Sequence, residues 1–185
     1  YTKRPEAEQD TGARLIGIHL EGPFISMEKK GAQNPAYIRN PDVEMFLRLQ
    51  EAAHGLVRLI TIAPETDGAK EFIRRLADQG PCVMIGRCAD YILAGRPDVV
   101  RVFVHADPEF CFEQAMKVDS LPENEVRKKI AEIDEYRARY YKHHTGRDWY
   151  DARNYDISIN SGVLGFDGTV EEIIKYMEVR EQFQK

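Results

Sequence analysis

The sequence is poor in cysteine and has no long apolar run. Its three cysteines, Cys82, Cys88 and Cys111, are too few and too scattered for a disulfide framework, and without a CxxC pair they give no zinc-finger spacing. We therefore expect a reducing, cytoplasmic location. No apolar stretch approaches the roughly 20 residues of a membrane span, and no signal-peptide pattern opens the printed chain. Because the first residue is Tyr1 and not Met, we expect further residues upstream.

The sequence also lacks an excess of positive charge. Its formal net charge is -5 and its pI is near 5.6, which argues against a general nucleic-acid or acidic-membrane surface. Any anionic ligand must then be met by local clusters of Arg and Lys. With 43% hydrophobic and 31% charged residues in a chain of 185, we expect an ordinary soluble globular protein of one domain or two small ones. The sequence does not indicate an oligomeric state.

Short apolar runs alternate with amphipathic segments along the chain. We expect strands over residues 14–20, 56–63, 82–86, 98–106 and 155–161. We expect helices over residues 41–49, 68–79, 108–118, 122–144 and 169–183. Several of the strands are nearly all apolar, which predicts an α/β fold with a mostly parallel sheet and flanking helices. Residues 1–13 are polar and without pattern, so we expect a flexible end there.

The motif HLEGPF carries the first candidate site residue. It places Glu21 just past the end of a predicted strand, where α/β enzymes assemble their sites. A carboxylate there can serve as a metal ligand or a base, and the glycine beside it lets a substrate approach the backbone. The plainer alternative is that Glu21 caps a turn and that His19 packs in the sheet.

A longer stretch around this motif carries a family resemblance. LIGIHLEGPFISMEKKGAQNP, followed about forty residues later by LITIAPE, resembles the N-acetylglucosamine-6-phosphate deacetylases, amidohydrolase-type enzymes with a TIM barrel. The resemblance covers about residues 12–80 and implies a TIM-barrel-like βα fragment over 14–80. It implies that Glu21 is a ligand of a catalytic divalent metal such as zinc, and that residues 31–34 lie on the sugar-phosphate side. Gln33 stands where some relatives have histidine.

The chemistry of a hydrolytic metal limits this first part of the chain. Such a site needs about three or four protein ligands, together with a carboxylate that handles the proton of the water. In the deacetylases two histidines and an aspartate lie downstream, and the first of them falls where this chain has Arg87. His105, His143 and His144 stand in contexts of another kind. We therefore do not expect this part to deacetylate alone.

The rest of the chain carries a different resemblance. From about residue 81 it contains GPCVMIGRCADYIL, RVFVHAD, IDEYRARYYKHHTGRDWYDARNYDISINS and LGFDGTVEEII. Together these resemble the cytidylate-kinase-like family of P-loop phosphotransferases, over about residues 81–180. The resemblance implies a P-loop-kinase-like fold for 81–185, with a lid at about 122–153 that closes over phosphates. The two resemblances meet between Glu65 and Pro81.

The second resemblance implies a phosphate site. Phosphoryl transfer requires several fixed cations around the moving phosphate, because charge spreads over its oxygens. The resemblance implies catalytic residues, Arg137 and Arg87, and substrate-binding residues, Arg87, Asp90, Asp134 and Arg139. Tyr140, Tyr141 and Trp149 either stack a base or pack between lid and core. For most of the charged residues the plainer alternative is a solvated helix face with i,i+4 ion pairs, and Asp90 alternatively caps its local helix.

The phosphate-binding loop of that family is missing. These kinases hold Mg-ATP on the pattern GxxxxGK[ST] between the first strand and the first helix, and the pattern does not occur in the 185 residues. The helix after RVFVHAD, which carries a basic stretch in the family, reads PEFCFEQAMK here. We therefore expect this helix to contribute less to phosphate binding than the basic helix of the family does. We therefore do not expect kinase activity from this chain alone.

Three functions stay open on the sequence. The first is a cytidylate-kinase-like nucleoside monophosphate phosphotransferase segment, inactive alone, that still binds a nucleoside monophosphate through Arg87 and the lid. The two apolar strands of the first part would then join its sheet. The second is a fragment of N-acetylglucosamine-6-phosphate deacetylase with an incomplete metal site. The third is a chimeric reading frame without enzymatic function. In the first two the ligand is a small phosphorylated molecule, a nucleoside monophosphate or an amino-sugar phosphate.

Overall fold

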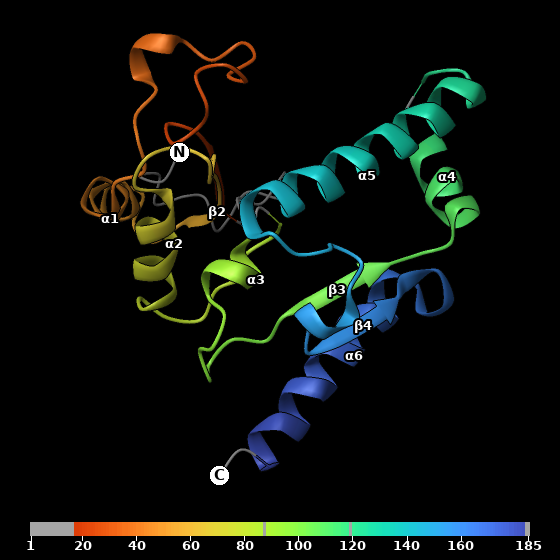
Figure 1. Ribbon diagram of the computed structural model, residues 1–185. Helices are drawn as coiled ribbons and strands as arrows, with labels where there is room; N and C mark the ends of the chain where they lie inside the picture. The colour runs from red at the N-terminus through yellow and green to blue at the C-terminus, as the bar shows by residue number, and fades with distance from the viewer. Residues whose placement is uncertain (1–16, 87, 119, 184–185) are drawn as a thin grey trace, which may run out of the picture. The chain divides into compact units, whose positions relative to one another are not determined.

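The structure is a computed structural model that describes residues 17–86, 88–118 and 120–183 (Figure 1). The chain divides into two compact units, Tyr1–Ile92 and Leu93–Lys185, here called unit 1 and unit 2. The predicted flexible end at residues 1–13 and the first residues of the predicted strand 14–20 lie outside the described part. The division rests on contacts within each unit, so it does not test where the two sequence resemblances meet.

Unit 1 alternates strands and helices. Its elements are β1 (Ile18–Glu21), a 3-10 turn η1 (Pro35–Tyr37), α1 (Val43–Ala52), β2 (Val57–Thr61), α2 (Ala69–Ala77) and the short α3 (Ala89–Ile92). The strands β1 and β2 are parallel, with Leu20 opposite Ile60 and Glu21 opposite Thr61. Helix α1 begins at Asp42, whose side chain accepts a hydrogen bond from the backbone N–H of Met45 at 2.8 Å.

The core of unit 1 lies on one face of this strand pair. It is formed by Phe24, Val43 and Phe72, with the two phenyl rings edge to face and their centroids 5.1 Å apart. Ile60 of β2 packs against this cluster. His19 and Glu21 are exposed, as the period of two along a strand requires for residues that alternate with the buried side.

The predicted strand over residues 82–86 is wrong. This segment is irregular, and Val83 and Ile85 are 88% and 85% exposed. In the described chain β1 pairs with β2 and β3 with β4, in two separate two-stranded sheets. An apolar run becomes a strand only where another strand accepts its backbone hydrogen bonds, and neither pair extends to this segment. The first hypothesis expected β1 and β2 to join the sheet of the kinase-like part. In the described chain they form a separate sheet, so this expectation is wrong.

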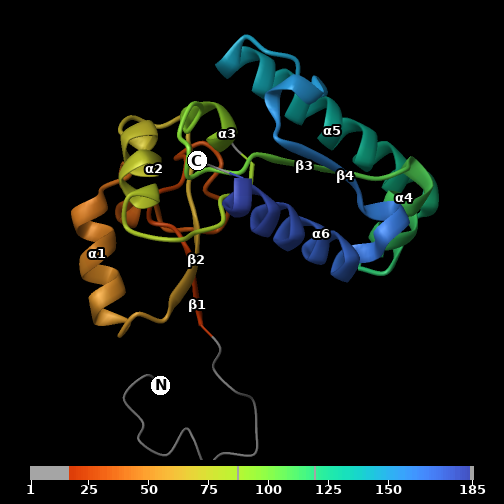
Figure 2. The same ribbon diagram turned by 90° about the horizontal axis from the view of Figure 1, so that it is seen from below.

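Unit 2 contains the second parallel strand pair. Its elements are β3 (Val102–His105), α4 (Pro108–Met116), α5 (Glu123–Thr145), the 3-10 turn η2 (Ala152–Asn154), β4 (Ile157–Asn160) and α6 (Ser161–Phe183). Helices α5 and α6 lie on opposite sides of the β3–β4 pair in both views (Figures 1 and 2). The predicted α/β fold class with parallel strands and flanking helices is therefore confirmed. The TIM-barrel origin of unit 1 stays a prediction.

Helix α6 begins earlier than predicted. The sequence suggests a start at Thr169, whereas the helix follows β4 directly from Ser161 and is kinked at Gly165, where φ is 69°. The left-handed backbone at this position favours glycine. The hydroxyl of Ser161 donates a hydrogen bond to the carbonyl of His105 at 3.1 Å, which ties the helix start to the end of β3.

The long helix α5 is held on α4 by one arginine. Arg127 donates two hydrogen bonds of 2.9 Å to the carboxylate of Glu109, and its guanidinium lies 3.7 Å from the ring centroid of Phe112. Val126 beside it is 1% exposed. The helix ends at Gly146, where φ is 72° and the backbone N–H donates to the carbonyl of Lys142. These contacts fix the orientation of α5 on α4.

An ion pair joins the amino ends of β3 and β4. Arg101 donates to Asp156 from its guanidinium Nη2 at 2.7 Å and from its backbone N–H at 2.8 Å. The side chains of Arg101 and Asp156 are only 25% and 22% exposed. The hydrogen bonds from Arg101 hold the pKa of the Asp156 carboxyl below its usual value, against the opposing effect of burial.

We predict that Asp156→Asn destabilises unit 2 by about 1–3 kcal/mol at pH 7, the usual range for lost hydrogen bonds to a charged group. Because the folded-state pKa of Asp156 lies below the unfolded value of about 4, its contribution is full above that pH and is lost as the pH falls through the folded-state pKa. Urea unfolding at several pH values measures the difference between variant and wild type. A difference that stays constant down to pH 2 would contradict the assignment.

Candidate functional site

The carboxyl end of β3 is where the structure gathers reactive side chains. In open α/β sheets ligands bind at the carboxyl ends of parallel strands. Asp107 follows β3 at the start of α4, and Cys111 lies one turn later in that helix. The thiol of Cys111 lies 4.0 Å from the carbonyl oxygen of Ala106, so it sits directly against the end of the strand.

Two residues of α5 face the same place. Arg137 donates from Nη1 to Oδ1 of Asp134 at 2.8 Å, an i,i+3 pair on one face of the helix. Burial raises the pKa of the Cys111 thiol, the negative charges of Asp134 and Asp107 add to this, and the positive charge of Arg137 opposes it. These charges act on the thiol only at short range, so α4 and α5 meet at this point.

Tyr150 completes the group from a third segment. Burial raises the pKa of its phenol, the charges of Asp134 and Asp148 add to this, and Arg137 again opposes it. The same two charges of α5 therefore act on Cys111 and on Tyr150. We call Cys111, Asp134, Arg137 and Tyr150 the strand-end cluster.

An aromatic wall positions Tyr150. Phe103 of β3 stacks on Tyr155 with centroids 4.9 Å apart, and Trp149 and Tyr150 meet the same ring edge to face at 5.4 and 6.3 Å. The Tyr155 hydroxyl donates to the carbonyl of Trp149 at 2.8 Å. The turn that carries Tyr150 is thus fixed against the strand. For Trp149, the structure places the ring in packing between this turn and β3.

The cluster has the chemistry of a small anion site. The side chain of Arg137 is 59% exposed and that of Asp134 is 42% exposed, so a ligand can reach both. A guanidinium presents up to five donors in a planar fork that fits phosphate or carboxylate oxygens. The negative charges of Asp107, Asp134 and Asp148 also act on members of the cluster, so they oppose the binding of any anion.

The structure brings together only part of the predicted phosphate site. Asp134 and Arg137 lie in the cluster, whereas Arg139 is two positions further along α5, on a different face, and pairs with Glu135 at 3.7 Å. Asp90 lies in the short α3 of unit 1 and is half-buried. Arg87 lies outside the described residues. The roles predicted for these residues are not tested by the geometry.

Glu21 does not gather a metal site in unit 1. It is exposed at the end of β1, and its neighbour His19 lies with Nε2 2.9 Å from the Thr61 hydroxyl. Within the residues that the structure describes, no group of three or more His, Cys, Asp or Glu side chains is placed to hold a metal ion. These residues therefore do not fit the three or four ligands of a hydrolytic zinc. For Mg-ATP the fit fails in the sequence, which has no GxxxxGK[ST].

Sequence reasoning missed two members of the cluster. Cys111 attracted notice only as a departure from a basic helix, and Tyr150 had no assigned role. The helical spacing of Asp134 and Arg137, combined with the rule on strand ends, was a usable signal for α5. No sequence signal joins α4, α5 and the turn at Tyr150, because these contacts are long-range.

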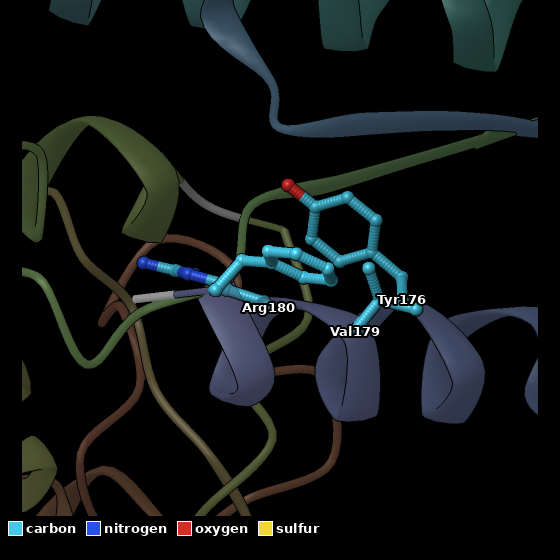
Figure 3. Close-up of a pocket in the computed structure, with 4 residues that line it drawn as sticks. Tyr176, Val179 and Arg180 are labelled. Atoms are coloured by element: carbon cyan, nitrogen blue, oxygen red, sulfur yellow. The ribbon is translucent and has the colours of Figure 1, made fainter. Parts of the chain in front are cut away.

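A hollow on α6 lies apart from this site. Its volume is about 320 Å³ and it is lined by Tyr176, Val179, Arg180 and Phe183 (Figure 3). The guanidinium of Arg180 donates to the carbonyls of Val99 and Pro97 at 2.6 and 2.7 Å. Its charge therefore serves to hold the loop before β3, and the hollow offers an apolar surface.

The arrangement of the cluster predicts the reactivity of Cys111. Because burial and Asp134 raise the pKa of this thiol, it should react with iodoacetamide more slowly at pH 8 than the exposed Cys82. Asp134→Asn removes one of the raising charges, so labelling of Cys111, resolved by peptide mass spectrometry, should become faster. Glu135→Gln, which removes a charge from the neighbouring position, is the matched control. Equal labelling rates in wild type and Asp134→Asn would show that the charge of Asp134 does not influence the pKa of the Cys111 thiol.

Comparison with curated proteins finds N-acetylglucosamine-6-phosphate deacetylases among the relatives of this chain. The chain is 45% identical over 84 residues to N-acetylglucosamine-6-phosphate deacetylase of Bacillus subtilis, a match that covers 45% of this chain and 21% of that protein. It is 44% identical over 77 residues to the enzyme of the same name from Bos taurus, covering 40% and 19%. The chain spans about a fifth of the length of these relatives. The predicted deacetylase resemblance is confirmed for part of the chain.

Comparison with solved structures finds a similar fold over part of the chain. A crystal structure of an uncharacterized protein from Eubacterium ventriosum is similar with a TM-score of 0.59 and 28% identity, over 63% of this chain and 68% of that one.

In the described part of the chain, none of the helices combines the length and apolar character that a bilayer crossing requires.

A family model shows which of the two resemblances covers more of the chain. The model of the cytidylate kinase-like family matches residues 60–163, which is more than half of the chain. The match contains β3, α4, α5 and β4, and with them every member of the strand-end cluster. The chain therefore belongs to the cytidylate kinase-like family.

Proposed function

We propose that this chain binds a nucleoside monophosphate at the strand-end cluster, as the acceptor-binding segment of a nucleoside monophosphate phosphotransferase. The observation that carries the proposal is the position of Arg137. Its charge acts on the Cys111 thiol, which lies against the end of β3. Arg137 also lies within the stretch that matches the family, and its side chain is 59% exposed, so a ligand can reach the guanidinium. The predicted cytoplasmic location suits such a ligand.

In this proposal Arg137 binds the phosphate through its planar fork. Tyr150 lies beside it and, with a raised pKa, keeps its proton and can donate a hydrogen bond. The family resemblance also implies substrate-binding roles for Arg87, Asp90 and Arg139. The same resemblance implies that α5 belongs to a lid over residues 122–153.

Phosphate transfer by the chain itself is not part of the proposal. The donor in such enzymes is Mg-ATP, held by the amides and lysine of a glycine-rich loop. Since the 185 residues contain no such loop, the chain lacks the groups that would hold the phosphates of the donor. The proposed activity is therefore binding of the acceptor without turnover of ATP.

We predict that isothermal titration detects saturable binding of CMP, and that Arg137→Ala weakens it by about 10- to 100-fold, the range for losing charged hydrogen bonds. The control is Arg75→Ala, which removes an arginine from an exposed ion pair of 2.6 Å with Glu44 in unit 1. This control should bind CMP like the wild type, and neither protein should hydrolyse ATP. Wild type without any CMP binding, or an equal loss in both variants, would reject the proposal.

A deacetylase fragment is the second candidate. It is favoured by the identity of 45% over 84 residues to the Bacillus subtilis enzyme, and it assigns Glu21 to a divalent metal such as zinc. The residues described around Glu21 do not fit that metal, so this candidate ranks behind the first. An amino-sugar phosphate would be its substrate.

We predict that zinc titration of the whole chain, monitored by calorimetry, shows no specific site that depends on Glu21, because a single carboxylate cannot hold a catalytic metal. Glu21→Gln should give the same titration as the wild type. A saturable one-to-one site in the wild type that disappears in Glu21→Gln would place the deacetylase candidate first.

A further inference from the structure

We infer that the imidazole ring of His105 is the base-binding part of the site, on which the base of a nucleoside monophosphate stacks. The inference rests on the proposed function and deepens it, because the phosphate of the same ligand is the group assigned to Arg137. It gives a role to a residue that neither family resemblance assigns. The observation that carries it is a column of three aromatic rings that ends at His105.

The column is built on strand β3. Phe103 and His105 are two residues apart on this strand, so their side chains lie on the same face of the strand pair. Their ring centroids are 5.9 Å apart, and the angle between the ring planes is 24°. Tyr155 stacks on Phe103 at the same angle of 24°, with centroids 4.9 Å apart. The rings of His105 and Tyr155 are therefore both close to parallel with that of Phe103.

The strand register gives the column its direction. Ile157 lies opposite Val102, so Tyr155, two residues earlier in the chain, reaches Phe103 from the amino end of the strand pair. His105 is the last residue of β3 and lies toward the carboxyl end. The column therefore runs from Tyr155 through Phe103 to His105. Its last ring stands at the end of the strands where open α/β sheets bind their ligands.

The inner rings of the column are held in place, whereas the last ring is accessible. Trp149 and Tyr150 meet the Phe103 ring edge to face at 5.4 and 6.3 Å, which fixes that ring from the side. His105 is exposed, and its carbonyl accepts the hydrogen bond of 3.1 Å from the Ser161 hydroxyl. Its backbone is thus fixed before a ligand arrives, which lowers the entropy cost of binding. A further planar ring can therefore add to the column at His105.

A nucleobase is the planar group that suits this position. Every base has a π face, and stacking on an aromatic side chain tolerates all of them because it uses this face and not the hydrogen-bonding edge. The residue after His105 is Ala106, whose carbonyl oxygen lies 4.0 Å from the thiol of Cys111 in the strand-end cluster. The ring and the cluster therefore adjoin the same strand end, so one ligand with a base and a phosphate can contact both. The substrate class is nucleoside monophosphates in general.

The experiment compares CMP with ribose 5-phosphate, which carries a sugar and a phosphate but no base. Both are titrated into the wild type and two variants, and NMR chemical shifts are followed because they also measure weak binding. We expect His105→Ala to weaken CMP binding by about five- to 20-fold, the lower part of the range for base–aromatic stacking, since only one face of the base is covered. Its affinity for ribose 5-phosphate should stay within about twofold of the wild type, because no base is lost. His105→Phe keeps a stacking ring and should bind CMP within about threefold of the wild type.

The matched control is His19→Ala, which removes an exposed histidine from strand β1 of unit 1 and should bind both ligands like the wild type. If CMP binds through Arg137 and His105→Ala binds it equally well, the inference is wrong and the proposed function stands. An equal loss of both ligands in His105→Ala, or a loss of CMP binding in His105→Phe as large as in His105→Ala, would also overturn the inference. Absence of CMP binding in every folded protein, with folding checked by near-ultraviolet circular dichroism, would overturn both.

Discussion

The parallel pairing of β3 with β4 is the constraint on which unit 2 depends. It puts His105 opposite Asn160, so both strands end at one edge. The Arg101–Asp156 ion pair fixes the opposite end of the same ladder. Parallel strands must be covered on both faces, and α5 and α6 lie on the two sides of the pair (Figure 1). The strand-end cluster adjoins this edge through Cys111, whose thiol lies 4.0 Å from the carbonyl oxygen of Ala106.

Local patterns predicted the helices well and the strands only in part. The apolar and charged spacing of α5 predicted residues 122–144, and the helix spans 123–145, because helical hydrogen bonds are local. The run at 82–86 has equally good strand residues and forms no strand, since a ladder depends on a distant partner. The same distinction holds for the site. Asp134 and Arg137 share one helix face and were predicted, whereas Cys111 and Tyr150 arrive through tertiary contacts.

The two candidate functions differ in how many precisely placed residues their sites need. A hydrolytic metal needs ligands that converge from several strands, and unit 1 presents Glu21 and His19 on a single strand pair. A phosphate can be bound by one guanidinium and a few donors on neighbouring segments. A partial fold therefore loses a metal centre sooner than it loses an anion site. This difference in demand, together with the extent of the family match, favours the kinase-like function over the deacetylase.

The charge of the chain explains why such a site would be weak. With a net charge of -5, the protein repels anions at long range, so binding depends on short-range contacts with Arg137. The neighbouring carboxylates weaken the attraction of that guanidinium for an anion. In a site that holds one cation among several acids, the acids repel the ligand and offset part of the attraction of the cation. A second cation at the phosphate would offset this repulsion and raise the affinity.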